Sequence, residues 1–390
     1  MKNNIKEGIF NLVYSDIFIK YSDTIFFYFI IICTASISAT LSYRYKNGKY
    51  YYNKLWLIIS FGILLCFLGF ASVGTDYFQY SNIFDKSLQV SYWKTTRIEK
   101  GFLLFNSIIR IFTSNFEVFH FLWALVILLL IYSTIIKFRR IISPGWAILA
   151  YSSVFMFQSL DLMRMYLAIA IAFWGVRYII NKKYYAYAVV IVVASLIHKT
   201  ALCLIIPFVI WRMFSKNEYY LSKTIVSFGV FIVVYFIRGF LFDGTFLGYS
   251  YKSHDSGEIG VIWIAYHLPI LAIFIYYRFI KKKYINDDFV SIMFIFLCSS
   301  AVMWCLSYFI EGIGRATFYF TYPFIILPQY LINQHSRQIT LGSKMVKHKN
   351  KRLGTKFISI AFIIYYIFRA YMMIGYLESD GLQIYRSIFN

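Results

Sequence analysis

Residues 116–137 read FEVFHFLWALVILLLIYSTIIK, with one acidic residue, Glu117, near the start and one basic residue, Lys137, at the end. An α-helix needs roughly 20 predominantly apolar residues to cross about 30 Å of hydrocarbon. This stretch is long enough, and its charges lie only at its ends. It therefore predicts a transmembrane helix.

Similar stretches recur along the whole chain. They lie at 24–43, 55–73, 116–137, 143–158, 165–181, 184–198, 200–214, 221–242, 259–280, 289–310, 315–332 and 357–377. By the same criterion of length and hydrophobicity, we predict an all-α, polytopic integral membrane protein with about twelve transmembrane helices.

The composition agrees with this prediction. The 390-residue chain is 60% hydrophobic and 14% charged, whereas soluble domains carry roughly 25% charged residues. No linker, repeat or low-complexity tract interrupts it, so we expect residues 1–390 to form a single transmembrane domain. Its largest connections are an external loop at 74–115 and a basic cytoplasmic loop at 333–356.

The basic residues indicate the orientation. With these spans, the connections on one side hold 24 Lys and Arg residues against three acids, and the rest of the chain holds 15 against 14. By the positive-inside rule the first side is cytoplasmic, which places both termini outside. The net charge of +22 is thus explained by topology and contact with anionic lipid, and no nucleic-acid partner is expected.

The first candidate for chemistry is the segment GTDYFQY at 74–80, directly after the second span. A carboxylate such as Asp76 at the membrane boundary is costly unless it is paired. It can accept a proton or hold a sugar hydroxyl, while Tyr77 and Tyr80 offer ring faces to sugars. The alternative is an aromatic belt with a helix-capping turn.

Glu99 opens the second candidate, EKGF at 99–102, and is a candidate base or sugar anchor. The stretch 101–114 that follows is too short and too polar to span. It predicts an interfacial or re-entrant helix with Asn106 and Arg110 on its wetter side, or a plain surface helix.

Two very short external turns carry the next candidates. Asp161 and Arg164 lie three residues apart and can pair with each other, but the planar fork of Arg164 also suits a phosphate. In the other turn, His198 can titrate near neutral pH and Lys199 can attract an anion; the alternative is a structural histidine at a helix end.

Glu311 and Arg315 flank a short, glycine-containing external loop and form an ion pair or a ligand site, and Arg369 lies within an apolar run. We expect these side chains to meet in one external cavity. No metal-ligand spacing and no nucleotide- or cofactor-binding motif is present, so we expect chemistry without a metal or cofactor.

These residues resemble a known family, the EpsG-like branch of polysaccharide polymerases, close to the Wzy O-antigen polymerases. The resemblance covers residues 70–320 and rests on an ordered set of motifs. They are Gly74-Thr75-Asp76-Tyr77 with Tyr80, Glu99 to Phe102, Arg164 at a helix start, His198 with Thr200 and Ala201, and Gly312 to Arg315.

The resemblance implies a GT-C-like polymerase bundle in the bacterial inner membrane. Such an enzyme moves a growing glycan from undecaprenyl pyrophosphate onto a new lipid-linked repeat unit at the periplasmic face. It implies catalytic roles for Asp76, Glu99, His198, Arg164 and Arg315, and substrate-binding roles for Tyr77, Tyr80, Asp161, Lys199, Glu311 and Arg369. A chain-length regulator is an expected candidate partner, besides the lipid bilayer.

Three other functions are compatible with the sequence. A flippase of lipid-linked oligosaccharide also needs many helices and a cationic cavity, but the candidate residues gather on one face and no internal repeat is evident. An O-antigen ligase shares the substrate, but the longest external loop here has only about 40 residues. A structural membrane subunit does not account for intramembrane cations.

Overall fold

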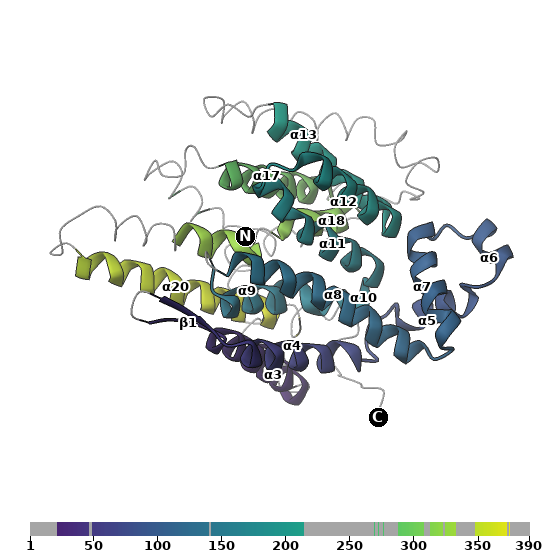
Figure 1. The fold of residues 1–390 in the computed structure, drawn as a ribbon, viewed down its shortest axis with the longest axis horizontal. Helices are drawn as coiled ribbons and strands as arrows, with labels where there is room; N and C mark the ends of the chain where they lie inside the picture. The colour runs from purple at the N-terminus through teal and green to yellow at the C-terminus, as the bar shows by residue number, and fades with distance from the viewer. Residues whose placement is uncertain are drawn as a thin grey trace, which may run out of the picture. The chain divides into compact units, whose positions relative to one another are not determined.

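The computed structural model describes residues 22–46, 49–139, 142–213, 288–307, 313–322, 324–332 and 348–372, with four single positions beyond them. These residues are mostly helical, which confirms the helical character predicted from the sequence (Figure 1). The predicted spans 221–242 and 259–280 lie outside the described residues, apart from three single positions, and so does Glu311.

The chain divides into two compact units, and the first comprises residues 1–88, 106–166 and 344–390. Its described elements are α3 (Ser22–Leu41), β1 (Tyr43–Lys46), β2 (Lys49–Tyr52), α4 (Lys54–Gly69), α5 (Tyr77–Lys86), α8 (Phe116–Phe138), α9 (Pro144–Tyr151), η1 (Ser152–Met156), α10 (Phe157–Asp161) and α20 (His348–Tyr371). Helices α7 (Lys100–Phe112) and α11 (Met163–Ile180) contribute residues to both units.

Helix packing in the first unit centres on α4, which lies against α3 and α8, while α3 also packs on α9. The core is aromatic: the ring of Tyr28 meets Phe67 edge-on at 5.5 Å and lies 5.1 Å from Phe157. Within this core the hydroxyl of Ser60 bonds that of Tyr132 at 2.7 Å. Such pairing offsets the cost of burying hydroxyls among apolar side chains.

A π-helical turn interrupts an otherwise α-helical segment in this unit. Helices α9 and α10 are joined without a break by the five-residue π-helix η1, and the segment 144–161 is buried along most of its length. A π-turn accommodates one extra residue within a helix. The segment ends at Asp161, so η1 lies directly upstream of a predicted site residue.

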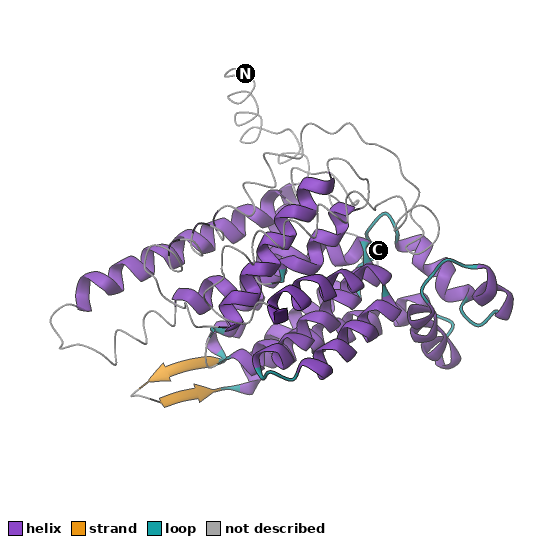
Figure 2. Ribbon diagram, turned by 90° about the horizontal axis from the view of Figure 1, so that it is seen from above, coloured by secondary structure: helices purple, strands orange, loops and turns teal. Residues whose placement is uncertain are grey.

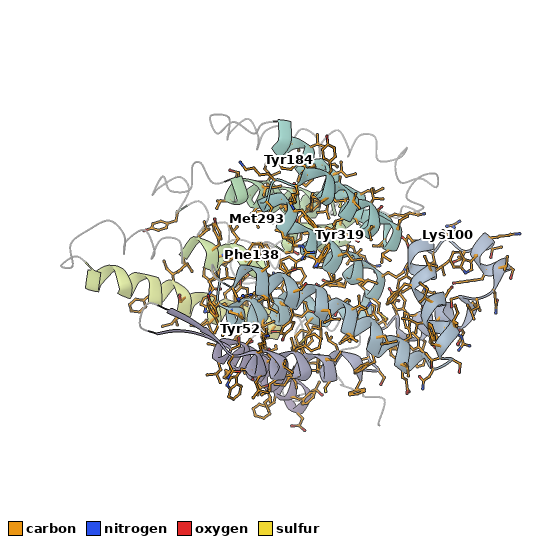
Figure 3. All side chains as sticks on the ribbon, in the orientation of Figure 1. Tyr52, Lys100, Phe138, Tyr184, Met293 and Tyr319 are labelled. Atoms are coloured by element: carbon orange, nitrogen blue, oxygen red, sulfur yellow. The ribbon has the colours of Figure 1, made fainter. Side chains whose placement is uncertain are left out.

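A short β-hairpin adds to the helices of the first unit. Strands β1 and β2 pair antiparallel, from Tyr43 opposite Tyr52 to Lys46 opposite Lys49 (Figure 2, orange). The intervening sequence is Asn47-Gly48, the pair that two-residue hairpin turns favour. The ring of Tyr52, labelled in Figure 3, lies 5.1 Å from the guanidinium of Arg139 at the end of α8. This hairpin lies in the predicted cytoplasmic connection 44–54 and was not expected from the sequence.

The second unit comprises residues 89–105 and 167–343. Besides its parts of α7 and α11, its described elements are α6 (Val90–Thr95), α12 (Tyr184–Ile197), η2 (Lys199–Leu204), α13 (Ile205–Met213), α17 (Asp288–Ser307) and α18 (Ile313–Thr321). Helix α17 packs on α18 and α13, and α12 packs on η2. Tyr322 lies at 5.4 Å from Phe296 and 5.8 Å from Phe173, and Met293 and Tyr319 are fully buried (Figure 3).

Apolar character extends to the outer surface of several helices. Helices α3 and α8 are long and apolar enough to cross a membrane, and shorter apolar helices lie at 54–69, 184–197, 199–210, 290–300 and 357–371. Large apolar side chains such as Phe26 and Leu55 point outward. Outward apolar stripes of this kind suit a lipid environment. The number of twelve spans stays a prediction.

Two predicted connections differ from the structure. The external turn predicted at 159–164 shrinks to one non-helical residue, Leu162, between α10 and α11. The basic loop predicted at 333–356 is shorter than expected, since α20 begins at His348. Charged residues at 348–356 thus extend a helix, because Lys and Arg are good helix formers.

Candidate functional site

The loop before α5 is docked onto the end of α10 in the first unit. The hydroxyl of Thr75 donates to Oδ1 of Asp161 at 2.5 Å, and the backbone N–H of Asp76 donates to the same oxygen at 3.2 Å. Gly74 has φ of +109°, and a Cβ there would lie 2.7 Å from the carbonyl oxygen of Leu160. The loop therefore requires glycine at position 74 for both backbone angle and space.

Asp76 occupies the N-cap position of α5 but does not use its side chain as a cap. Its backbone has φ −90° and ψ 0°, and its carboxylate makes no capping hydrogen bond. Its carbonyl oxygen accepts the N–H of Tyr80 at 3.0 Å. The helix-capping turn considered as an alternative is thus not what positions this half-buried carboxylate.

Tyr80 and Arg164 form the next contact in this cluster. Tyr80 is 4% exposed, and burial raises the pKa of its hydroxyl above the ordinary value of 10.0, while the attraction of Arg164 and its hydrogen bond to the tyrosine oppose that rise. The nearby carboxylate of Asp76 raises the pKa further. Tyr80 therefore keeps its proton at neutral pH, in contact with a guanidinium and near a carboxylate.

Helix α8 contacts the two segments that form this cluster. The buried ring of His120 stacks on Trp123 with centroids 5.2 Å apart and meets Tyr77 edge-on at 5.6 Å. The indole N–H of Trp123 donates to the carbonyl oxygen of Met163 at 3.1 Å. One helix thus contacts the Gly74–Tyr80 segment through His120 and the start of α11 through Trp123.

A second cluster lies in the second unit and joins Glu99 to the end of α12. Oε1 of Glu99 lies 3.0 Å from Nδ1 of His198 and accepts the backbone N–H of Lys199 at 3.2 Å. Glu99 and His198 are both buried. A carboxylate held by an imidazole and a backbone donor has a fixed orientation, which a general base or a sugar ligand requires.

The remaining residues of the Glu-x-Gly-Phe segment explain how this pair forms. A Cβ on Gly101 would lie 2.5 Å from the carbonyl oxygen of Leu196, so only glycine lets α7 approach the end of α12 this closely. Phe102 is fully buried and anchors the helix. Lys100, labelled in Figure 3, donates to the carbonyl oxygen of Trp93 and lies over its ring.

Two further predicted residues lie on helices α18 and α20. Arg315 is exposed in the first turn of α18. Arg369 is 4% exposed on α20 and hydrogen-bonds Tyr365 one turn earlier. Among the residues that the structure describes, no three His, Cys, Asp or Glu side chains gather as metal ligands do.

The predicted site residues therefore form two clusters in the structure. Asp76, Tyr80, Asp161 and Arg164 come together in the first unit, and Glu99, His198 and Lys199 in the second. Their union in one external cavity stays a prediction. Sequence reasoning named Thr75 only as part of a motif and missed His120 and Trp123 as site-forming residues. The signal for His120 was available, since an ionisable side chain inside an apolar span is a functional candidate by default.

Outward-facing apolar helices with buried clusters of ionisable side chains are features of α-helical integral membrane proteins. A model of the EpsG family matches residues 54–387, and the chain belongs to this family. The match confirms the resemblance drawn from the motifs. No curated protein and no solved structure matches the chain.

Proposed function

We propose that this protein is a surface-polysaccharide polymerase of the O-antigen type. It transfers a growing glycan from undecaprenyl pyrophosphate onto a new lipid-linked repeat unit at the periplasmic face of the bacterial inner membrane. The EpsG family, which is associated with polysaccharide polymerisation in membranes, supports the general class. The proposal depends on the residues of the two clusters for its detail.

One observation carries the proposal: the two candidate arginines each lie in the first turn of a helix. Arg164 is the second residue of α11, and Arg315 is the third residue of α18. Cations are disfavoured at this end, where the helix dipole is positive and backbone N–H groups lack helical partners. An arginine there, together with the dipole, favours an anion, and a lipid pyrophosphate provides one.

The proposed reaction needs little more than an anion site for the pyrophosphate. The bond between the anomeric carbon of the donor glycan and the pyrophosphate oxygen breaks, and the acceptor hydroxyl oxygen forms the new bond to that carbon. The leaving group is undecaprenyl pyrophosphate, whose developing charge the arginines stabilise without a metal. The hydroxyl proton passes to a carboxylate.

The other residues take roles that follow from their contacts. Glu99, oriented by His198 and the N–H of Lys199, deprotonates or orients the acceptor hydroxyl. Asp76, which lies near Tyr80, has the same role toward the acceptor hydroxyl. Asp161 positions the Gly74–Asp76 loop, so its contribution to sugar binding is indirect. Arg369 and the ring of Tyr77 bind substrate.

Replacement of Arg164 tests this function. In a strain that lacks the chromosomal copy, Arg164→Ala should accumulate normally in the membrane but leave surface glycans with a single repeat on a gel. Arg177→Ala is the matched control, because Arg177 lies on the same helix, α11, near its other end. The control should restore the full ladder. A full ladder from Arg164→Ala at equal protein level would remove Arg164 from the mechanism.

The same gel separates the proposal from its main alternatives. In the deletion strain, a polymerase defect leaves one repeat attached to its acceptor. Loss of every repeat would instead identify a flippase of lipid-linked oligosaccharide or a ligase.

A further inference from the structure

Helix α7 buries polar residues and turns a stripe of large apolar side chains outward. Its polar residues Asn106 and Ser107 are buried, whereas Ile108 is 50% exposed, Ile111 69% and Phe112 84%. The sequence prediction that placed Asn106 on the wetter side is therefore wrong, whereas Arg110 is part-exposed and lies beside the exposed Asp85. On a helix in water such a stripe turns inward. Here it turns outward, while Phe102, Leu103 and Ile109 are buried beside the polar residues.

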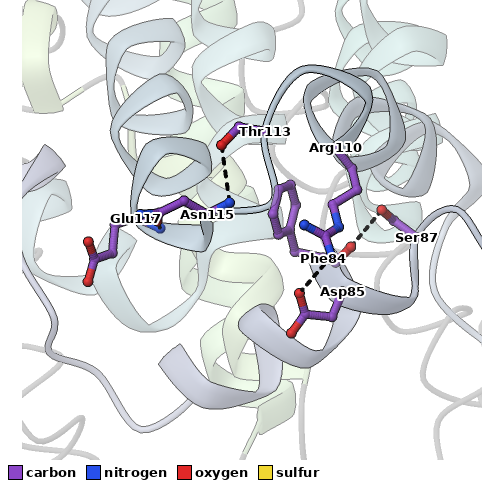
Figure 4. A network of polar contacts seen from close by, with 7 residues as sticks. All are labelled: Phe84, Asp85, Ser87, Arg110, Thr113, Asn115 and Glu117. Atoms are coloured by element: carbon purple, nitrogen blue, oxygen red, sulfur yellow. Dashed lines mark hydrogen bonds and ion pairs between the residues drawn. The ribbon is translucent and has the colours of Figure 1, made fainter.

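Polar contacts on the inner face fix this orientation (Figure 4). The guanidinium of Arg110 lies 3.5 Å from the carboxylate of Asp85 and 5.2 Å from the ring centre of Phe84 on α5. The hydroxyl of Ser107 donates to the carbonyl oxygen of Ser87 at 2.7 Å. Because rolling α7 to bury these apolar side chains would break both contacts, they hold the helix in this orientation.

The stripe also lies next to the start of a helix suited to a membrane. Phe112 is followed by only three residues before α8, which is long and apolar enough to span. The connection is fixed, because Asn115 caps α8 by accepting the N–H of Glu117 at 2.6 Å and itself donates its N–H to Thr113 (Figure 4). The stripe is therefore held close to the first residue of α8.

We propose that α7 is an interfacial anchor whose outward stripe, Ile108, Ile111 and Phe112 with Leu104, lies among the acyl chains of the outer leaflet. An apolar face at an interface gains roughly 25 cal/mol for each Å² removed from water. The choice of leaflet rests on the proposed orientation, in which the loop 74–115 is external.

The anchor also sets the depth of the first cluster. Helix α5 is tied to α7 at its end, through Asp85 and Ser87, and begins one residue after Asp76. Ten helical residues span about 15 Å. When the stripe on α7 lies among the acyl chains, α7 therefore holds Asp76 and Tyr80 within reach of the headgroup layer. The pyrophosphate of a lipid-linked substrate lies in that layer.

The test uses the full chain in liposomes, with the native cysteines replaced by alanine and one new cysteine carrying an environment-sensitive fluorophore. Probes at Ile111→Cys and Phe112→Cys should be quenched several-fold more strongly by phosphatidylcholine with a nitroxide on its acyl chain than a probe at Thr95→Cys. Thr95 is exposed on α6 of the same loop and supplies the control.

Two outcomes overturn the inference. One is quenching at Ile111 and Phe112 equal to that at Thr95, with both positions open to a water-soluble quencher. The other is protection from both quenchers, which would assign the stripe to another protein. Lipid quenching together with an unchanged glycan ladder in the deletion strain would leave the anchor standing and refute the polymerase.

Discussion

Thr75 donates a hydrogen bond to Asp161 although 86 positions separate the two residues. The same carboxylate oxygen also accepts the backbone N–H of Asp76. One buried side chain thus determines where the Gly74–Tyr80 segment lies, and the start of α11 with Arg164 follows two residues after it. Asp161 is a positioning residue in this arrangement.

Replacement of Asp161 by Asn should weaken, but not abolish, glycan polymerisation. The amide oxygen can still accept from Thr75 and Asp76, while the charge that strengthens both hydrogen bonds is lost. Asp161→Ala removes the acceptor, so it should lower the free energy of unfolding by about 1–3 kcal/mol more than Asp161→Asn does. Ladder length at matched protein level checks the order wild type, Asn, Ala. Equal ladders for Asn and Ala would contradict the positioning role.

Replacement of Glu99 by Gln should abolish long chains without unfolding the protein. The amide of the new side chain keeps an oxygen that can accept from His198 and Lys199 but cannot take a proton from the acceptor hydroxyl. The temperature of thermal unfolding in detergent should stay close to that of the wild type, while the long chains of the ladder are lost. Glu117→Gln, at an exposed position on α8, is the matched control and should leave the ladder intact.

Gly74→Ala should destabilise the protein by about 1–3 kcal/mol, because alanine is strained at φ of +109° and its Cβ would press on the carbonyl of Leu160. Gly62→Ala provides the opposite case. Gly62 lies within α4 with no atom within 4 Å of an added Cβ, so alanine there should stabilise by about 0.5–1 kcal/mol. Resistance to heat or protease in detergent measures both. Similar effects of the two variants would show that the loop is not held as described.

Tyr80→Phe should lower activity roughly tenfold or more, because a hydrogen bond to a charged group is worth about 1.5–3 kcal/mol. The Tyr80→Phe variant should also lose less stability than the wild type as the pH rises into the alkaline range. Burial raises the pKa of Tyr80 in the folded state, so the unfolded chain loses this proton first as pH rises. The stabilising contribution is complete below about pH 10 and is lost as pH rises through the folded pKa.

Thermal unfolding between about pH 8 and about pH 11, on either side of the ordinary tyrosine pKa of about 10, measures this contribution. Tyr185→Phe is the control, since Tyr185 is 92% exposed on α12. An equally steep alkaline loss in wild type and Tyr80→Phe would contradict the assignment.

The helices could be predicted from sequence more fully than the contacts between them. The helix predicted at 116–137 is confirmed as α8, residues 116–138, because length and hydropathy are local properties of the chain. The pairing of Glu99 with His198 could not be derived that way, since 99 positions separate them. Sequence analysis placed both residues among the candidates and left open what each one touches.

One part of the prediction for α7, the side on which Asn106 lies, failed for a physical reason. Polar residues were assumed to face water, which is the rule for helices on soluble domains. Asn106 is instead buried, and the part-exposed guanidinium of Arg110 lies beside Asp85 and the ring of Phe84 on α5. The amphipathic period was visible in the sequence, but the direction of its polar face depended on partners from another helix.

The π-turn at 152–156 lets the chain absorb the deletion of one residue. In an α-helix each residue advances the side chains by about 100° around the axis. Removal of Ser153 would take out the extra residue of the π-turn, so the segment would close into regular α-helix with Asp161 still facing Thr75. A second deletion would find no extra residue to remove, and Asp161 would then swing by about 100° away from the Gly74–Tyr80 segment, with every side chain of the cluster still present in the sequence.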